Sequence, residues 1–271
     1  MIKTKRGNKT ERIMFNAFSG KLHPQEVASM RKRVNYVDES YNFPEINPIQ
    51  MKMPNYNGRG MEITIANYRW PAEGECKGVV HWVHGYGDYV ARYGYLAKAF
   101  SQSGYDFVGI DQRGFGHSEG RPGMIESEAF ARDDLVTYSL RLKLMYGDDV
   151  PIYMVGHSLG GALSILVATS APDTVKGVTL LAPFLGFHNP EALSKIMPIA
   201  KVVNWIRPTH KFKLNPEGNV FAYNEHFFND KKCRSLQVSA QNAVLNETLL
   251  KKLHEKYIPR FQHPLLTIEC D

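Results

Sequence analysis

The sequence predicts an α/β protein built on a mostly parallel sheet with helices on both faces. Four short apolar runs lie between residues 78 and 181, and each gap between them contains a segment of helical spacing. Parallel strands buried on both faces are near-continuous apolar runs, and crossover helices join them. The chain has 271 residues, 43% apolar and 22% charged, which suits one large globular domain with an insertion.

The individual elements follow from local patterns. An early antiparallel strand is expected at 61–70, where apolar and polar residues partly alternate. The four apolar runs are the central strands, at 78–83, 105–110, 151–155 and 175–181. Helices are expected at 93–103, 127–146 and 159–169. Ser127 has the side chain of an N-cap and Glu128 follows it in the first turn, so the second helix begins there.

The alternation of strands and helices stops after Pro183. The next part of the chain is mostly helical in pattern and interrupted by prolines, until His263-Pro264 opens one more apolar run. An insertion between two strands of one sheet is the simplest organisation. We therefore expect a basic polar N-terminal extension (1–57), a core (58–186), a helical cap insertion (187–262) and the start of a C-terminal core segment (263–271).

The net charge of +6 is concentrated near the N-terminus. Residues 1–33 hold nine basic and two acidic residues, and the remaining 24 basic and 25 acidic residues nearly cancel. A solvated tail is the simplest role for such a leader, and a weak tether to anionic lipid or RNA is the alternative. Because the rest of the chain is neutral, we expect no nucleic-acid partner.

Several protein classes are excluded by what the sequence lacks. No stretch approaches the roughly 20 apolar residues of a membrane-spanning helix. Cys76, Cys233 and Cys270 are far apart and form no CxxC pair, so neither zinc nor a disulfide is expected. We expect a cytoplasmic protein with free thiols, without a metal or an organic cofactor.

The residues 156–161, GHSLGG, contain the G-x-S-x-G pattern between a strand and a helix. A serine in this context occupies a strained turn that lifts its hydroxyl above the sheet edge. Glycines two positions away on either side let the strand and the helix approach closely. The turn also places the serine at a helix N-terminus, whose N–H groups face developing negative charge. Ser158 is therefore the candidate nucleophile, and a purely structural turn is the alternative.

A second segment supports this interpretation. An oxyanion hole needs two N–H donors about 3 Å from the substrate oxygen. Leu159, the residue after the serine, offers one donor, and Tyr86 in the glycine-flanked HGYGD segment (84–88) is placed to offer the other. A plain strand-to-helix loop is the alternative. A third segment, DQRGFGHSEG (111–120), lacks the Lys-Ser/Thr of a phosphate-binding P-loop, so we expect it to brace the site.

HGYGD, DQRGFGHSEG and GHSLGG, in this order and spacing, resemble the α/β-hydrolase fold over residues 60–271. The closest resemblance is to the monoacylglycerol lipase and lysophospholipase group, also called the serine aminopeptidase S33 or hydrolase-4 family. The resemblance implies a serine ester hydrolase with Ser158 as nucleophile, the Tyr86 and Leu159 amides as oxyanion hole, and a helical cap between strands six and seven.

The sequence departs from the family pattern near its end. The family's catalytic acid lies nine residues after a strand-opening proline, here Pro264, which corresponds to position 273. Asp271 is two residues early, and the family's histidine would come later still. His157 is expected to point to the opposite side from Ser158. We therefore expect an α/β-hydrolase whose last strand and helices are missing and whose strand at 264–270 is an exposed edge.

The resemblance also implies a substrate. It favours a lipid ester such as a monoacylglycerol or lysophospholipid, cleaved through an acyl-enzyme on Ser158. Residues 193–206 are unusually apolar, so they form either a helix packed on the domain or a surface that contacts membranes peripherally, with Lys195 and Lys201 at the headgroups. Peptidase, thioesterase and acyltransferase activities stay open. Because the acid and base are missing, an inactive remnant that binds lipid or regulates is the alternative.

Overall fold

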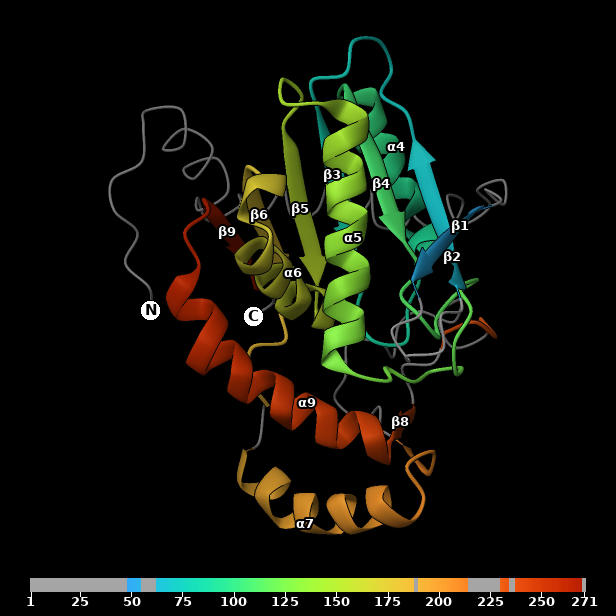
Figure 1. Ribbon diagram of the computed structural model, residues 1–271, viewed down its shortest axis with the longest axis vertical. Coiled ribbons are helices and arrows are strands. Elements are labelled where there is room, and N and C mark those ends of the chain that lie inside the picture. The colour runs from blue at the N-terminus through green and yellow to red at the C-terminus, as the bar shows by residue number, and fades with distance from the viewer. Residues whose placement is uncertain (1–47, 55–61, 188–189, 214–229, 234–236, 270–271) are drawn as a thin grey trace, which may run out of the picture. The chain divides into compact units, whose positions relative to one another are not determined.

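The computed structural model describes residues 48–54, 62–187, 190–213, 230–233 and 237–269, all within the compact unit Pro44–Asp271 (Figure 1). They form a seven-stranded sheet in the order β1-β2-β4-β3-β5-β6-β9. Its strands are β1 (Ile49–Pro54), β2 (Glu62–Trp70), β3 (Gly78–Val83), β4 (Tyr105–Ile110), β5 (Ile152–His157), β6 (Gly177–Leu181) and β9 (Leu265–Ile268). Strands β4, β3, β5, β6 and β9 run parallel to one another, β2 runs antiparallel to β4, and β1 runs antiparallel to β2. The predicted mostly parallel sheet is confirmed.

Helices cover both faces of the sheet. On one face α5 (Glu128–Tyr146) and α6 (Leu159–Ser170) pack into the larger hydrophobic core, and on the other α4 (Gly94–Gln102) packs into a smaller one. Successive β3 residues alternate between the two cores, with Val79 in the larger and Val80 in the smaller. Ser127 caps α5 as predicted, because its side chain accepts a hydrogen bond from the Phe130 amide at 3.0 Å.

The first strand begins earlier than the sequence analysis predicts. The sequence predicts a polar extension over residues 1–57, yet β1 lies inside that range and pairs with β2. Met51 and Met53 point inward while Lys52 between them is exposed, which is the two-residue alternation of a strand. Proline at the end of β1 concealed the pattern, but an edge strand accommodates proline without losing an internal ladder bond. Residues 1–47 and 55–57 of the predicted extension lie outside the described residues.

The inserted segment has two layers. Its described parts are α7 (Pro190–Ile206), β7 (Lys211–Lys213), β8 (Gln237–Ser239) and α9 (Ala240–Lys252), followed by a π-helical turn over Leu253–Tyr257 and a 3-10 turn over Ile258–Arg260. Strands β7 and β8 form a separate antiparallel pair. Leu249, Leu253 and Tyr257 are buried in the larger core. Helix α7 packs on α9, so α9 lies between α7 and the core (Figure 1).

The sheet ends in an exposed apolar strand. All four residues of β9 are exposed, and among the described residues no strand pairs with its outer edge. Leu266 and Ile268 lie in register with Thr179 and Leu181 of β6, so they share one face of the sheet. On the same face Tyr153 of the central strand β5 is 40% exposed. Within the described part of the chain this edge is therefore apolar and unpaired, as the sequence analysis expects.

The buried His81 makes the stability of this core depend on pH. Burial lowers the pKa of His81 to about 3 from the ordinary 6.5. Between these two values the unfolded state binds a proton that the folded state does not. We therefore predict that His81 makes the free energy of unfolding fall, as the pH drops from 6.5 towards 3, by up to about 1.4 kcal/mol per pH unit.

The replacement His81→Leu removes this contribution, so its urea-unfolding free energy declines less between pH 7.5 and pH 5 than that of the wild type. The matched control is His210→Gln, a change at an exposed residue between α7 and β7, which keeps the wild-type slope. An unchanged slope in His81→Leu would show that another group carries the pH dependence.

Candidate active site

Ser158 lies in a strained turn between β5 and α6. Its backbone φ is 53° and its ψ is −119°, in a region that side-chain-bearing residues rarely adopt. The Ser158 amide donates to the Leu181 carbonyl at 3.0 Å. The Ser158 carbonyl accepts from the amides of Gly161 and Phe184, both at 2.9 Å. Both peptide groups of the turn are thus held by neighbouring elements, and the side chain remains half-buried at the end of the sheet.

The glycines around Ser158 are required by close backbone contacts. A Cβ added to Gly160 would collide with the carbonyl oxygens of Val83 and His84, at the end of β3. A Cβ on Gly156 would collide with the Gly160 carbonyl, which lies in the first turn of α6. The G-x-S-x-G spacing therefore lets the start of α6 pass directly over β3, which is the steric reason expected from the sequence.

The peptide between Gly85 and Tyr86 lies beside Ser158. A Cβ added to Gly85 would be 3.2 Å from the Ser158 Cβ. The backbone amide of Gln112 donates to Nε2 of His84 at 2.8 Å. Because Nε2 accepts this bond, the ring proton of His84 is on Nδ1, which donates to the Gly85 carbonyl at 2.8 Å. The carbonyl and the following N–H of a trans peptide point in opposite directions. The Tyr86 N–H is therefore directed away from His84.

The second predicted donor is the amide of Leu159. Leu159 is the first residue of α6, where N–H groups have no acceptor within the helix and the helix dipole is positive. Among the described residues, neither the Leu159 amide nor the Tyr86 amide has a hydrogen-bond acceptor. The structure thus brings Ser158, Tyr86 and Leu159 together at the carboxyl ends of β3 and β5.

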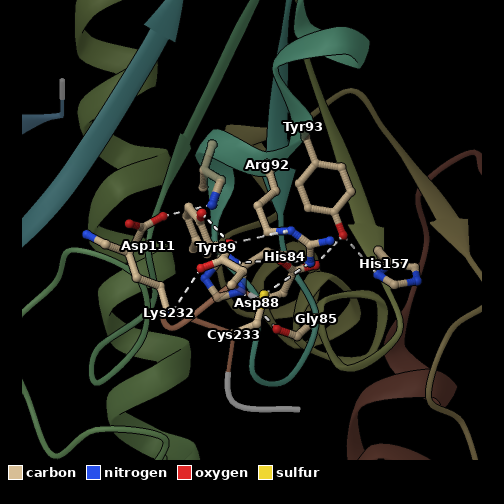
Figure 2. A network of polar contacts seen from close by, with 12 residues as sticks. His84, Gly85, Asp88, Tyr89, Arg92, Tyr93, Asp111, His157, Lys232 and Cys233 are labelled. Atoms are coloured by element: carbon tan, nitrogen blue, oxygen red, sulfur yellow. Dashed lines mark hydrogen bonds and ion pairs between the residues drawn. The ribbon is translucent and has the colours of Figure 1, made fainter. Parts of the chain in front are cut away.

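A buried polar network follows the HGYGD segment, and the sequence analysis missed it (Figure 2). The Asp88 carboxylate accepts hydrogen bonds from the Tyr89 amide (2.8 Å), the Arg92 guanidinium (2.9 Å) and the Tyr93 hydroxyl (2.5 Å). Burial, and then the Asp88 charge, raise the pKa of Tyr93 well above its usual value, so its hydroxyl stays protonated. The network fixes the chain that directly follows the Tyr86 loop, from Asp88 to Tyr93. The Asp-x-x-x-Arg spacing, which favours an ion pair on a helical turn, was its one signal in the sequence.

This network also contacts the residue before Ser158. The Tyr93 hydroxyl lies 3.3 Å from Nδ1 of His157 (Figure 2). Because Tyr93 donates its proton to Asp88, His157 is the donor in this contact. Burial lowers the pKa of His157, which favours its neutral form. His157 thus links the end of β5 to the Asp88 network.

The glycine-rich segment around Asp111 braces the same end of the sheet. The Asp111 carboxylate accepts hydrogen bonds from the Val90 amide (2.8 Å), the Tyr68 hydroxyl (2.9 Å) and the His117 amide (2.9 Å). Gly116 is required because an added Cβ would collide with this carboxylate. These contacts support the bracing role expected for residues 111–120.

Comparison with known proteins then identifies the family. The family described as "Serine aminopeptidase, S33" matches residues 74–261. The chain belongs to this serine hydrolase family. Monoglyceride lipase of Mus musculus is 33% identical over 141 residues, which are 51% of this chain and 46% of the mouse protein. The match thus spans about half the length of that relative.

Two further similarities extend over more of the chain. The monoglyceride lipase homolog of Monkeypox virus is 28% identical over 71% of this chain and 70% of its own. The crystal structure of a soluble variant of monoglyceride lipase from Saccharomyces cerevisiae superposes with a TM-score of 0.68 at 23% identity. It covers 84% of this chain and 79% of the yeast one. The yeast structure confirms the α/β-hydrolase fold.

None of the described histidines hydrogen-bonds to the Ser158 side chain. His84 hydrogen-bonds to the Gly85 carbonyl, and His157 contacts the Tyr93 hydroxyl. His254 and His263 contact the carbonyls of Leu185 (2.7 Å) and Pro172 (2.9 Å). Asp271, His188 and His226 lie outside the described residues. Within the described ranges no cluster of metal ligands occurs, and no helix has the length and apolarity to cross a membrane. Cys76 and Cys233 are free thiols.

The contact of Gly160 with β3 predicts a large effect of a small substitution. Gly160→Ala places a methyl group against two backbone carbonyls that cannot move without distorting β3, so we predict a loss of about 2–4 kcal/mol in the free energy of unfolding. The control is Gly186→Ala, where an added Cβ meets nothing within 4 Å. Chemical unfolding of the two variants measures the difference, and equal stability would contradict the close approach of α6 to β3.

Proposed function

We propose that this protein hydrolyses a lipid ester, such as a monoacylglycerol or lysophospholipid, with Ser158 as the nucleophile. The observation that carries the proposal is the strained Ser158 turn next to two amides that lack acceptors in the described structure. A serine hydroxyl beside two convergent N–H donors is the arrangement needed for acyl transfer. The names of the mouse and viral relatives favour a glyceride as the substrate.

The reaction has two steps. The Ser158 oxygen attacks the ester carbonyl carbon and its proton passes to a base. The oxygen that becomes negative then accepts hydrogen bonds from the Tyr86 and Leu159 amides. Collapse of this intermediate breaks the bond to the glycerol oxygen, which leaves with a proton as the alcohol. Water then attacks the acyl-Ser158 ester by the reverse sequence and releases the fatty acid.

A second candidate function is lipid binding without turnover. Among the described residues no histidine or carboxylate hydrogen-bonds to Ser158, which favours this candidate. The loss of a general base lowers turnover in serine hydrolases by roughly 10⁶-fold. Such a protein would keep the arrangement of Ser158 beside the Tyr86 and Leu159 amides and would act as a binding or regulatory protein.

A fluorophosphonate probe tests the proposed nucleophile. We predict that the probe labels the 271-residue chain and that Ser158→Ala abolishes the labelling, because the probe forms its bond with the serine oxygen. Ser170→Ala, at the exposed end of the same helix, serves as the control and labels like the wild type. Equal labelling of Ser158→Ala would contradict the proposal. Labelling without release of fatty acid from a monoacylglycerol would instead favour the binding protein.

We also propose that α7 contacts a membrane surface, as a peripheral and cytoplasmic protein would. Met197 and Ala200 of α7 are buried, whereas its other face exposes Ile196, Ile199, Val202, Trp205 and Ile206. An exposed apolar stripe on an amphipathic helix suits the interface between headgroups and acyl chains. Lys195 is exposed and available to anionic headgroups, but Lys201 pairs with Glu247 of α9 at 2.8 Å.

Vesicle co-sedimentation measures this contact. We predict that Ile199→Glu combined with Trp205→Glu weakens binding to phosphatidylcholine–phosphatidylserine vesicles by at least roughly 10-fold, because each inserted apolar side chain contributes about 1.5–3 kcal/mol. Leu144→Glu is the control, since Leu144 is an equally exposed apolar residue, 85% exposed, on α5. If Leu144→Glu weakens binding as much, α7 is not the contact surface.

A further inference from the structure

The side chain of Tyr86 links the oxyanion segment to the inserted helix α9. Its hydroxyl lies 3.0 Å from the Gly123 carbonyl and 3.1 Å from the Gln237 carbonyl of β8. It also accepts a hydrogen bond from Nδ2 of Asn242 at 3.0 Å. Burial raises the pKa of Tyr86, and the hydrogen bond from Asn242 lowers it in part, so the hydroxyl is protonated at neutral pH. The backbone of Tyr86 lies beside Ser158, but its side chain ends in the inserted segment.

The side chain of Asn242 is held in one place by its other hydrogen bonds, which favours its bond to the Tyr86 hydroxyl. It is completely buried in the first turn of α9. Its Oδ1 accepts from the Ile125 amide at 3.0 Å, and its Nδ2 also approaches the Gly123 carbonyl at 3.1 Å. The backbone amide of Asn242 donates to Oγ of Ser239, the N-cap of α9, at 3.1 Å. A buried amide with every polar atom paired has one favourable orientation, because any rotation leaves buried groups without partners.

We propose that Asn242 is a positioning residue for the oxyanion hole, acting through the Tyr86 hydroxyl. In this arrangement α9 sets the direction of the Tyr86 N–H. The catalytic consequence rests on the proposed function, whereas the mechanical link between α9 and the loop does not.

The loop needs such an anchor because its neighbours are glycines. Gly85 and Gly87 flank Tyr86, and Gly87 has a φ of 75°. Glycines leave the adjacent peptides free to rotate, so backbone contacts alone define their orientation weakly. His84 holds the Gly85 carbonyl on one side of Tyr86, and Asn242 holds the hydroxyl on the other. An oxyanion donor stabilises charge best when its direction is fixed before the reaction.

The link to α9 is firm at its other end. Leu249 and Leu253 bury the far end of this helix in the main core. Gln241, beside Asn242, donates from Nε2 to the Glu126 carbonyl at 2.8 Å. Gln241 thus attaches α9 to the same neighbouring segment as Asn242 does, but its side chain makes no hydrogen bond to Tyr86. It is therefore a matched control for loss of a side-chain contact in this turn.

The experiment compares Tyr86→Phe, Asn242→Ala, their double variant and Gln241→Ala in the full chain. Tyr86→Phe removes only the hydroxyl and keeps the ring that packs on Phe115. The rate constant for Ser158 labelling by a fluorophosphonate falls on the order of 10-fold in each of the first two variants. Gln241→Ala stays within about two-fold of the wild type. Asn242→Ala causes no further loss in the Tyr86→Phe background, because both changes break one link.

Additive losses in the double variant would overturn the proposal, since Asn242 would then act by another route. A loss of the same size in Gln241→Ala would also overturn it. If Asn242→Ala fails to fold, Tyr86→Phe decides alone, because Asn242 keeps its bonds to Gly123 and Ile125 there. A wild-type rate in that variant would then refute the link.

Amide hydrogen exchange separates this proposal from the proposed function. If the wild-type chain is not labelled at all, the proposed function fails, and the exchange rates of amides 85–88 decide whether the link exists. Faster exchange in Tyr86→Phe and Asn242→Ala, with wild-type exchange in Gln241→Ala, supports the link. Unchanged exchange in all three variants refutes it.

Discussion

The contact between the start of α6 and the end of β3 determines the geometry of the site. Gly160 lies so close to the Val83 and His84 carbonyls that no side chain fits between them. This contact fixes where α6 begins, and therefore where the Leu159 amide points and how close Ser158 lies to the loop after β3. The positive φ of Ser158 costs about 1–3 kcal/mol, and the surrounding hydrogen bonds to its amide and carbonyl hold it in place.

Two polar networks then fix the loops around that contact. Asp88 and Arg92 form a nearly buried ion pair, with side chains 8% and 13% exposed. Asp111 accepts hydrogen bonds from Tyr68 and Val90 of other elements and from the His117 amide of its own loop. Removing one partner of a buried pair costs about 3–5 kcal/mol, because the remaining charge stays desolvated. A loop held this way changes orientation only with a large loss of stability. The chain from Asp88 to Tyr93, which follows Tyr86, is accordingly rigid.

Local patterns predicted much of this architecture. The strands at 78–83 and 105–110 have the bounds expected, as does the Ser127 cap, because each depends on neighbouring residues alone. The Ser158 turn was recognisable because its steric demands fall within six consecutive residues. Strand β1 was missed because it is short and ends at a proline. The partner of Tyr86 was not predictable, since Asn242 lies 156 residues away and a mid-chain asparagine has many roles.

The two layers of the inserted segment differ in how far they can move. Displacing α9 together with the π-helical turn that continues it would expose Leu249, Leu253 and Tyr257, each of which contributes about 1.5–3 kcal/mol by its burial. It would also leave Asn242 and its buried partners without hydrogen bonds, at about 1–3 kcal/mol for each such group. Displacing α7 alone exposes far less, because much of its surface already faces solvent. Of the two helices of the inserted segment, α7 is therefore the one whose displacement costs less free energy, whereas α9 is held by buried apolar and polar contacts.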